Sequence, residues 1–250
     1  MKMLRSLVLV LVTGAVSVVG AWKAKPLPSY ISPCRRSDPD FSKCFVTSGR
    51  KAISRVLRGD PAYNLKPFLP YRLEKVDISP GMKLSLTLKN VDLYGLDTMD
   101  LINADIDLER RHFSIDLHTK LFVVLANYTV SGQILFLPVS GSGPTKLEFN
   151  DSDVNLSYDY DLVTRSDGKR YVANVRQHVS CNINKAHYQL DNLFNGNKLL
   201  GDNVNKILND NYEEVLDQFG AVIREIIGLM STELIRAYIT AVPYDELFLP

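Results

Sequence analysis

The chain has 250 residues, of which 29 are lysine or arginine and 28 are aspartate or glutamate, so its formal net charge is +1. This near balance gives no long-range attraction for nucleic acid or for anionic lipid. The length is sufficient for one large domain or two small ones.

The first residues have the pattern of a secretory signal peptide. Lys2 and Arg5 precede an apolar run at 7–19, and the residues that follow permit cleavage after Ala21. The run is too short to span a bilayer, so no stable membrane insertion is expected. We predict a signal peptide at 1–21 and a secreted, extracellular mature chain. Because 1–21 contains two basic residues and no acidic one, its removal leaves a formal charge of −1.

Secretion permits disulfides, and this changes how the three cysteines are interpreted. Cys34 and Cys44 lie ten residues apart around a helix start at 37–39, where a disulfide would staple the incoming arm to the helix. Cys181 lies in an alternating strand pattern and is interpreted as a small buried apolar side chain. A covalent dimer or a reactive thiol is the alternative for Cys181.

A first helix is predicted from about Asp40 to Arg58, with a stop at 59–61. From Tyr71 to about Leu190 the apolar period changes from helical to two, which is typical of strands with one apolar and one polar face. The alternation is clearest at 82–89 and 153–162. Less regular strands are predicted at 106–117, 121–130, 133–137, 146–149 and 171–183, with turns at 80–81, 141–144 and 167–168.

One long amphipathic helix is predicted from Asn203 to about Thr240. Its apolar residues recur every three or four positions from Val204 to Leu234, so they form one stripe. The stripe is wider than a two-position seam, which favours packing on a sheet over a coiled coil, the main alternative. Beyond Leu234 the apolar side changes, which indicates a bend near 231–232 or cover from another segment.

These elements predict an α+β fold. Many strands with short connections form an antiparallel meander whose apolar face needs a partner, and the long C-terminal helix supplies one. The simplest arrangement is a strongly curved antiparallel sheet wrapped around that helix. A separate sandwich with a helical tail is the alternative, but it would leave the apolar stripe exposed.

No pattern in the sequence indicates catalysis, a metal site or a cofactor. The four histidines are scattered, no Cys-x-x-Cys pair occurs, and phosphate-binding and nucleophile-elbow motifs are missing. Asp159 and Asp161 share a strand face, but that face is the polar one, so they are interpreted as solvated surface. We therefore predict a binding protein and not an enzyme. Sequons at Asn127, Asn150 and Asn155 are candidate glycosylation sites.

Several segments together resemble the insect haemolymph juvenile hormone-binding proteins, in particular their takeout-like branch. The resemblance covers essentially the whole mature chain and is strongest near its end. It begins at Cys34 and Cys44 and continues through LRGDP at 57–61, GQILFLPVSGSG at 132–143, LFNGNKLLGD at 193–202, LNDNY at 208–212 and VPYDELF at 242–248.

The resemblance implies a tubular lipid-binding fold of the super-roll type, in which 22–250 forms a single domain with an internal hydrophobic tunnel. It also implies a secreted, monomeric carrier in haemolymph or another extracellular fluid. The ligand would be juvenile hormone, another isoprenoid, a fatty acid or an odorant. Hormone carriers of the family typically have a second disulfide between a strand and the long helix. The predicted helix has no cysteine to pair with Cys181, which favours the takeout-like branch.

Such a tunnel would be lined by strand residues and by the helix stripe. The candidates are Leu84, Leu86, Phe113, Ile115, Ile134, Phe136, Tyr158, Phe219, Val222, Ile223, Ile226 and Met230. Two alternatives to a carrier remain: a secreted binder of lipid or membrane surfaces, and a signalling partner with a filled core and no transported ligand.

Overall fold

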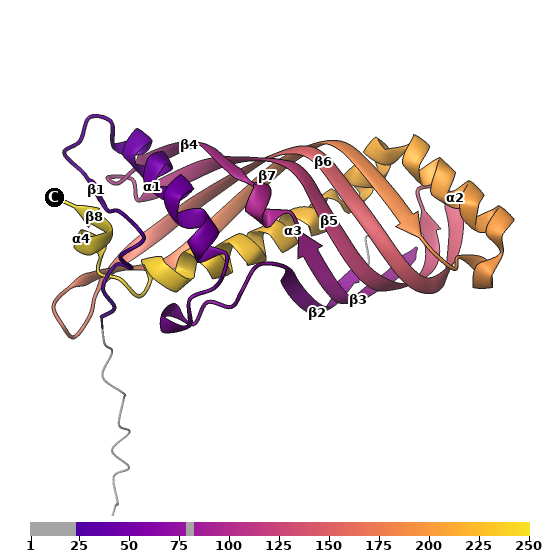
Figure 1. Cartoon of the computed structure of the whole chain (residues 1–250), viewed down its shortest axis with the longest axis horizontal. Helices are drawn as coiled ribbons and strands as arrows, with labels where there is room; N and C mark the ends of the chain where they lie inside the picture. Colours follow the sequence, from indigo (N-terminus) through magenta and orange to yellow (C-terminus); the bar gives the residue numbers. More distant parts are fainter. Residues whose placement is uncertain (1–23, 79–82) are drawn as a thin grey trace, which may run out of the picture.

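A computed structural model describes residues 24–78 and 83–250, and Figure 1 shows the order of its elements. The predicted signal peptide, Met82 and the predicted turn at 80–81 lie outside the described residues. The helices are α1 (Phe41–Val56), α2 (Lys198–Asp210), α3 (Tyr212–Ile239) and α4 (Tyr244–Leu247), with 3-10 turns η1 (Pro61–Tyr63), η2 (Leu96–Thr98) and η3 (Phe194–Gly196). The strands are β1 (Cys34–Arg35), β2 (Tyr71–Ile78), β3 (Leu84–Tyr94), β4 (Asp100–Asp107), β5 (His112–Ile134), β6 (Leu137–Thr164), β7 (Arg170–Leu190) and β8 (Phe248–Leu249).

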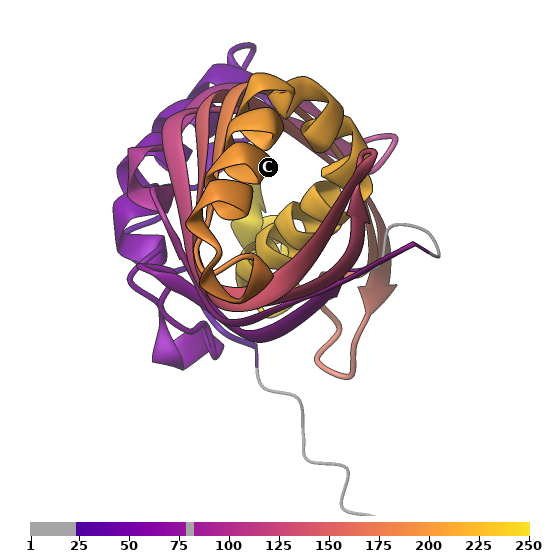
Figure 2. The same ribbon diagram turned by 90° about the vertical axis from the view of Figure 1, so that its right-hand side faces the viewer.

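Six strands form one antiparallel sheet in the order β2-β3-β5-β6-β7, with β4 paired to the free part of β5. The sheet is open, because no ladder among the described residues joins β2 to β7. Strands β5 and β6 are far longer than a usual strand and pair from His112↔Asp159 to Ile134↔Leu137. Figure 2, a view along the long axis, shows the sheet and helices α2 and α3 around a common axis.

Helix α3 lies along β7 at the edge of the sheet, and it contributes side chains to all three buried clusters of the protein. Gly228 permits the close approach, since a Cβ there would collide with the Gln177 side chain of β7. The hydroxyl of Thr232 also donates to the Gln177 side chain. The predicted contact of the helix stripe with the sheet is therefore present.

The prediction of one uninterrupted helix from Asn203 to Thr240 is wrong. Helix α2 ends at Asp210 and α3 begins at Tyr212. Between them Asn211 leaves the helical region (φ −121°, ψ 42°), and its side-chain amide donates to the Ile207 carbonyl at 2.7 Å. The Asn211 backbone N–H donates to the same carbonyl at 3.1 Å, and local side-chain bonding of this kind is one reason why asparagine favours helix ends. The apolar spacing continues across this break, so the sequence pattern does not reveal it.

Two causes were predicted for the change of apolar side after Leu234, a bend or cover from another segment, and the structure shows the second. Helix α3 continues without a break to Ile239, so there is no bend at 231–232. Ile235 and Ile239 instead pack against the buried cluster that includes Phe113, Tyr160 and Tyr244. Cover from another segment, here from the sheet and α4, therefore explains the pattern.

The long strands were predicted as shorter pieces because their inward face changes midway. Successive inward side chains are three positions apart, instead of two, from Thr119 to Phe122 on β5 and from Phe149 to Ser152 on β6. The same step occurs on β7 between Ile183 and Ala186, and Asp151 within the β6 step has φ 51°. The ladder continues across this irregularity. The apolar alternation in the sequence is therefore interrupted at these positions, although the strands continue through them.

Two predicted boundaries fail for other reasons. The expected strand at 106–117 is divided by a turn at 108–111, between β4 and β5. The expected turn at 141–144 lies inside β6 and pairs with β5. Its glycines are required because the segment after β7 crosses close to β6: a Cβ on Gly143 would collide with the Asp191 carbonyl. The turn at 167–168 is present, with Gly168 N–H donating to the Arg165 carbonyl at 3.0 Å.

Side chains of α2 satisfy the free edge of β7 at one end of the molecule. Asn209 accepts from Tyr188 N–H at 2.7 Å and donates to its carbonyl at 2.8 Å. Asn205, one turn earlier, does the same for Leu190 at 3.0 and 2.9 Å. The two amides replace the missing neighbouring strand, so this edge carries no unpaired backbone groups at these residues.

The opposite end is closed by contacts between the two ends of the described chain. The predicted disulfide joins Cys34 to Cys44, with the Cα atoms 6.0 Å apart. It holds β1 next to α1, and β1 pairs with β8 in parallel. Asp245 of α4 accepts from Arg36 and, at 2.8 Å, from Arg170. In Figure 1 this closure lies at the left, beyond the end of α3.

Candidate functional site

An elongated cavity of about 460 Å³ lies between the sheet and α3. Strands β2 to β7 form one wall and α3 forms the other, and residues of α1 and of the segment before it also line the cavity. The wall passes through all three buried clusters, so the cavity follows the long axis of the molecule. Many apolar wall residues, such as Leu86, Ile115 and Val222, are only half-buried although they face inward, because they border this space.

The structure places nine of the twelve predicted lining residues on the wall of this cavity. They are Leu86, Phe113, Ile115, Ile134, Phe219, Val222, Ile223, Ile226 and Met230. Their role in ligand binding remains a prediction. Leu84 and Tyr158 are buried in the packed clusters beside the cavity and do not reach it.

Phe136 is a wrong assignment, because its side chain is 69% exposed. It lies in the tight connection between β5 and β6, where Leu135 has φ 55° and its N–H donates to the Gln218 side chain of α3. Alternation cannot be extended through such a turn, so the inward face of β5 does not continue to Phe136.

Sequence reasoning missed the part of the wall that comes from distant segments. Phe45, Ala52 and Ile53 of α1 line the cavity, and Leu27 and Ile31 of the preceding arm join them. The helix itself was predicted, but no sequence signal distinguishes a wall residue from a packed core residue. The sequence signal that links these residues is the Cys34–Cys44 pair, whose disulfide fixes the arm against α1.

The wall carries no charged side chain among the described residues. Its polar groups are hydroxyls and one thiol, and most hydroxyls are engaged within the protein. Tyr128 donates to the Asp191 carbonyl at 2.6 Å, Thr145 to the Gln189 carbonyl at 2.7 Å, and Tyr71 to Glu233 at 3.0 Å. Burial raises the pKa of Tyr71 and of Tyr128 to about 12, so both stay neutral donors.

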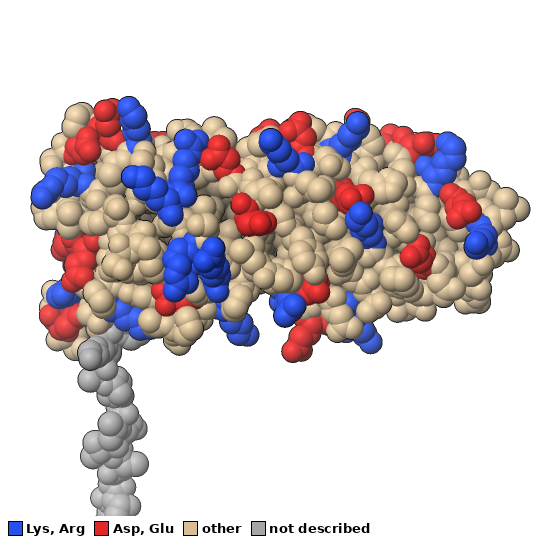
Figure 3. All heavy atoms as spheres, viewed as in Figure 1, with Lys and Arg blue, Asp and Glu red and all other residues tan. Residues whose placement is uncertain are grey.

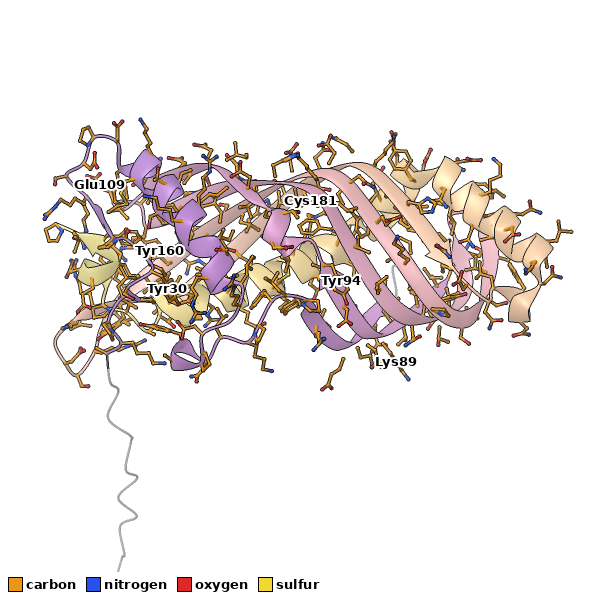
Figure 4. All side chains as sticks on the ribbon, viewed as in Figure 1. Tyr30, Lys89, Tyr94, Glu109, Tyr160 and Cys181 are labelled. Atoms are coloured by element: carbon orange, nitrogen blue, oxygen red, sulfur yellow. A yellow bond between two sulfur atoms is a disulfide. The ribbon has the colours of Figure 1, made fainter. Side chains whose placement is uncertain are left out.

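Cys181 is a free thiol on this wall, on the middle part of β7, as Figure 4 shows. Burial raises its pKa, and Arg224 acts weakly in the opposite direction. A thiol whose pKa is raised by apolar surroundings is a poor nucleophile. Its half-buried position on β7 fits the interpretation of a small apolar residue.

The acidic pair Asp159 and Asp161 lies on the outer face of the sheet. Asp159 contacts His112 at 2.9 Å, and Asp161 accepts from Asn174 at 3.0 Å. The amide of Asn174, followed by Arg176, lowers the pKa of Asp161, which is solvated. Within residues 24–78 and 83–250 no group of three or more His, Cys, Asp and Glu side chains is placed to hold a metal ion.

The three sequons differ in their surroundings. Asn127 is exposed on β5, whereas Asn150 and Asn155 are half-buried on β6. The amide of Asn155 also donates to Asp116 at 2.7 Å. Glycosylation of any of the three remains a prediction. None of the helices in the described chain is long and apolar enough to cross a membrane.

Known proteins share this fold and this sequence pattern. The crystal structure of Takeout 1 from Epiphyas postvittana superposes with a TM-score of 0.80 at 27% identity, over 88% of this chain and all of that one. The circadian clock-controlled protein daywake is 26% identical over 227 residues in Drosophila melanogaster and 24% identical over 232 residues in Drosophila yakuba, with 87% of each chain covered. The family model of the haemolymph juvenile hormone binding proteins matches residues 7–249. The chain therefore belongs to the haemolymph juvenile hormone binding protein family, and its relatives place it with the takeout-like members.

Proposed function

We propose that the protein is a secreted carrier that binds a small hydrophobic ligand in its internal cavity. The observation that carries this proposal is a cavity of about 460 Å³ whose wall has no charged side chain. Pockets for small ligands are apolar with a few placed polar groups, and this cavity has that composition. The family is one of binding proteins for hydrophobic ligands, which supports a binder and not an enzyme.

We infer further that the cavity acts as a tunnel, with the sheet curved around α3 in a tubular, super-roll arrangement. Ligands of the proposed class are juvenile hormone, another isoprenoid, a fatty acid or an odorant. An apolar ligand that buries roughly 300 Å² would gain on the order of 7 kcal/mol from transfer alone. The loss of freedom on binding offsets much of this, so shape and a few polar contacts would set selectivity.

The remaining parts of the proposal follow from the sequence. Residues 1–21 would be removed as a signal peptide, and 22–250 would act as one monomeric carrier domain in haemolymph or another extracellular fluid. A binder of membrane surfaces would favour a basic or aromatic patch. On the face shown in Figure 3, basic and acidic side chains are interspersed, which gives no such attraction.

The test is native mass spectrometry of the secreted protein, followed by solvent extraction and identification of what leaves. We expect a bound apolar molecule, and uptake of added isoprenoid or fatty acid by the extracted protein. Ile226→Trp fills part of the cavity and should reduce this uptake, whereas Leu229→Trp, on the exposed side of the same helix, should not.

Two results would contradict the carrier. An empty protein that refuses every added ligand would indicate an interior that closes in solution, as in a signalling partner. Co-sedimentation with liposomes, unaffected by Ile226→Trp, would instead indicate a binder of lipid surfaces.

A further inference from the structure

One hydroxyl on the cavity wall lacks the partner that the others have. Ser152 of β6 is 1% exposed, and its Oγ is buried with no hydrogen-bond partner. Buried polar groups are nearly always hydrogen-bonded, so such an exception in a cavity wall requires an explanation. Ser32, which also borders the cavity, is exposed to solvent and needs no protein partner.

Every other buried wall hydroxyl in the described chain is engaged. Besides Tyr71, Tyr128 and Thr145, the bonded ones are Ser48 to the Ser32 carbonyl at 2.6 Å, Ser231 to the Gly228 carbonyl at 3.1 Å, Tyr188 to the Tyr212 carbonyl at 3.3 Å, and Tyr238 with Tyr30 at 3.1 Å. The Tyr158 hydroxyl is also buried without a clear bond, but it lies beside Ser231 and outside the cavity wall.

The position of Ser152 is set by the change of inward face in the long strands. It pairs with Thr119 on one side and Ile183 on the other, at the point where the inward side chains skip a residue. Thr119 is not its partner in this arrangement: Ser152 Oγ has no hydrogen-bond partner, and the Thr119 hydroxyl contacts Thr98 at 3.2 Å. The cavity wall continues beyond Ser152 in both directions along β6, so this hydroxyl lies midway.

A trapped water is a poor substitute for a partner here. A buried water is held by two to four polar groups, and the side chains paired with Ser152 on the neighbouring strands offer one, the Thr119 hydroxyl, because Ile183 is apolar. Ser152 Oγ is buried in this conformation, so a polar atom of an apolar molecule would reach it after a rotation about the Cα–Cβ bond of the serine, without needing further partners.

The wall also restricts the charge of that molecule. With no cationic side chain on it, an ionised carboxylate at this depth would be desolvated without compensation. A carbonyl, ester or ether oxygen would carry no such cost, and a serine hydroxyl is free to rotate and donate to it.

We infer that Ser152 is the internal polar contact of the ligand, and that the ligand is a neutral, elongated molecule with an uncharged oxygen part way along its apolar body. This inference rests on the proposed carrier function. It assigns the selection between oxygenated molecules and plain hydrocarbons to one hydroxyl at the middle of the cavity.

The test compares two named probes: a symmetrical long-chain ketone with its carbonyl at the centre, and the alkane with the same number of carbons. Each displaces an environment-sensitive apolar dye from wild-type protein, from Ser152→Ala and from Thr145→Val. The last variant is the matched control, because it removes a wall hydroxyl that is already bonded to a strand carbonyl.

We expect wild type and Thr145→Val to prefer the ketone, and Ser152→Ala to lose roughly three- to tenfold in ketone affinity with alkane affinity unchanged, as for one hydrogen bond. A carbon-13 label in the carbonyl should show a shift in the bound state that disappears in Ser152→Ala. A purely structural effect of the substitution would not produce this difference.

Two outcomes are adverse and distinguishable. An unchanged ratio of ketone to alkane affinity in Ser152→Ala, with both probes bound, would overturn the contact and leave the carrier intact. Failure of wild type to bind either probe would overturn both. The empty Ser152→Ala protein should be at least as stable as wild type, because the substitution removes an unpaired buried group.

Discussion

Phe219→Ala tests directly whether the cavity sets the size of the ligand. Phe219 lies on α3, borders the cavity and packs against the sheet cluster that includes Tyr128 and Leu208. A ligand that covers about 50 Å² of this ring would lose about 1.2 kcal/mol when the ring is removed, or about eightfold in affinity. Each further methylene that the enlarged cavity accepts restores about 0.8 kcal/mol, so the preferred chain should lengthen by about two methylenes.

The assay is dye displacement by a series of straight-chain ketones of increasing length. Phe136→Ala is the matched control, because it makes the same chemical change at a side chain that is 69% exposed. Since Phe219 is half-buried, its removal should cost about half of the ~3–5 kcal/mol of a fully buried phenylalanine, which leaves a folded protein to measure. An optimum that stays at the same length in both variants would refute the placement of the ligand beside Phe219.

Four further predictions concern the contacts that hold the cavity together and the effect of a bound ligand on stability. Asn209→Ala should cost about 1–3 kcal/mol in chemical denaturation, because it leaves the N–H and carbonyl of Tyr188 unpaired. Cys34→Ser should cost about 2–4 kcal/mol through loss of the disulfide, seen as a lower Tm. Asp245, whose pKa is lowered from 3.8 mainly by Arg36, stabilises the fold above its ordinary pKa. The Tm difference from Asp245→Asn should therefore shrink as the pH falls through the lowered value. Extraction of a bound ligand should lower Tm, and its return should restore Tm by mass action.

Matched controls separate these effects from general damage. Asn182→Ala and Asp217→Asn change exposed side chains of the same types and should leave stability nearly unchanged. Cys181→Ala removes the thiol that has no disulfide partner, so it should leave Tm close to that of wild type. Equal losses in a variant and its control would contradict the role assigned to that contact.

The helix, the sheet and the disulfide were predictable because each has a local signal. The stripe from Val204 to Leu234 required an apolar partner, and α3 packs against β7. What failed was the assumption that a period continues unchanged along an element. Asn211 divides the helix through its own side chain, and the strands change their inward face at Thr119, Ser152 and Ile183 while their ladders continue.

Glycine positions show a second reason why local patterns mislead. The segment 141–144 has the composition of a turn, yet it lies inside a paired strand, near the start of β6. Gly143 is required by the Asp191 backbone crossing above it, a contact between residues far apart in sequence. A close approach and a turn favour the same residue type, and only the tertiary structure distinguishes them.

The wall of the cavity was partly predictable, but the space that it encloses was not. Ile223 and Met230 were predicted to line the tunnel because they belong to the apolar helix stripe. A helix face that packs against a sheet and a face that lines a cavity show the same apolar pattern, so the sequence does not distinguish them. The difference depends on the distance between backbones, which here is set by the disulfide, the Asp245 contacts and the asparagines of α2.

A cavity of this size is costly unless something occupies it. Each apolar side chain that faces this space forgoes dispersion contacts with a packing partner, and in small sealed cavities such loss costs about 24 cal/mol per Å³. Side chains that could close the gap are held apart by contacts at both ends of the molecule. Under the proposed carrier function an apolar occupant would supply the missing packing, and the contacts at both ends would keep the interior open to it.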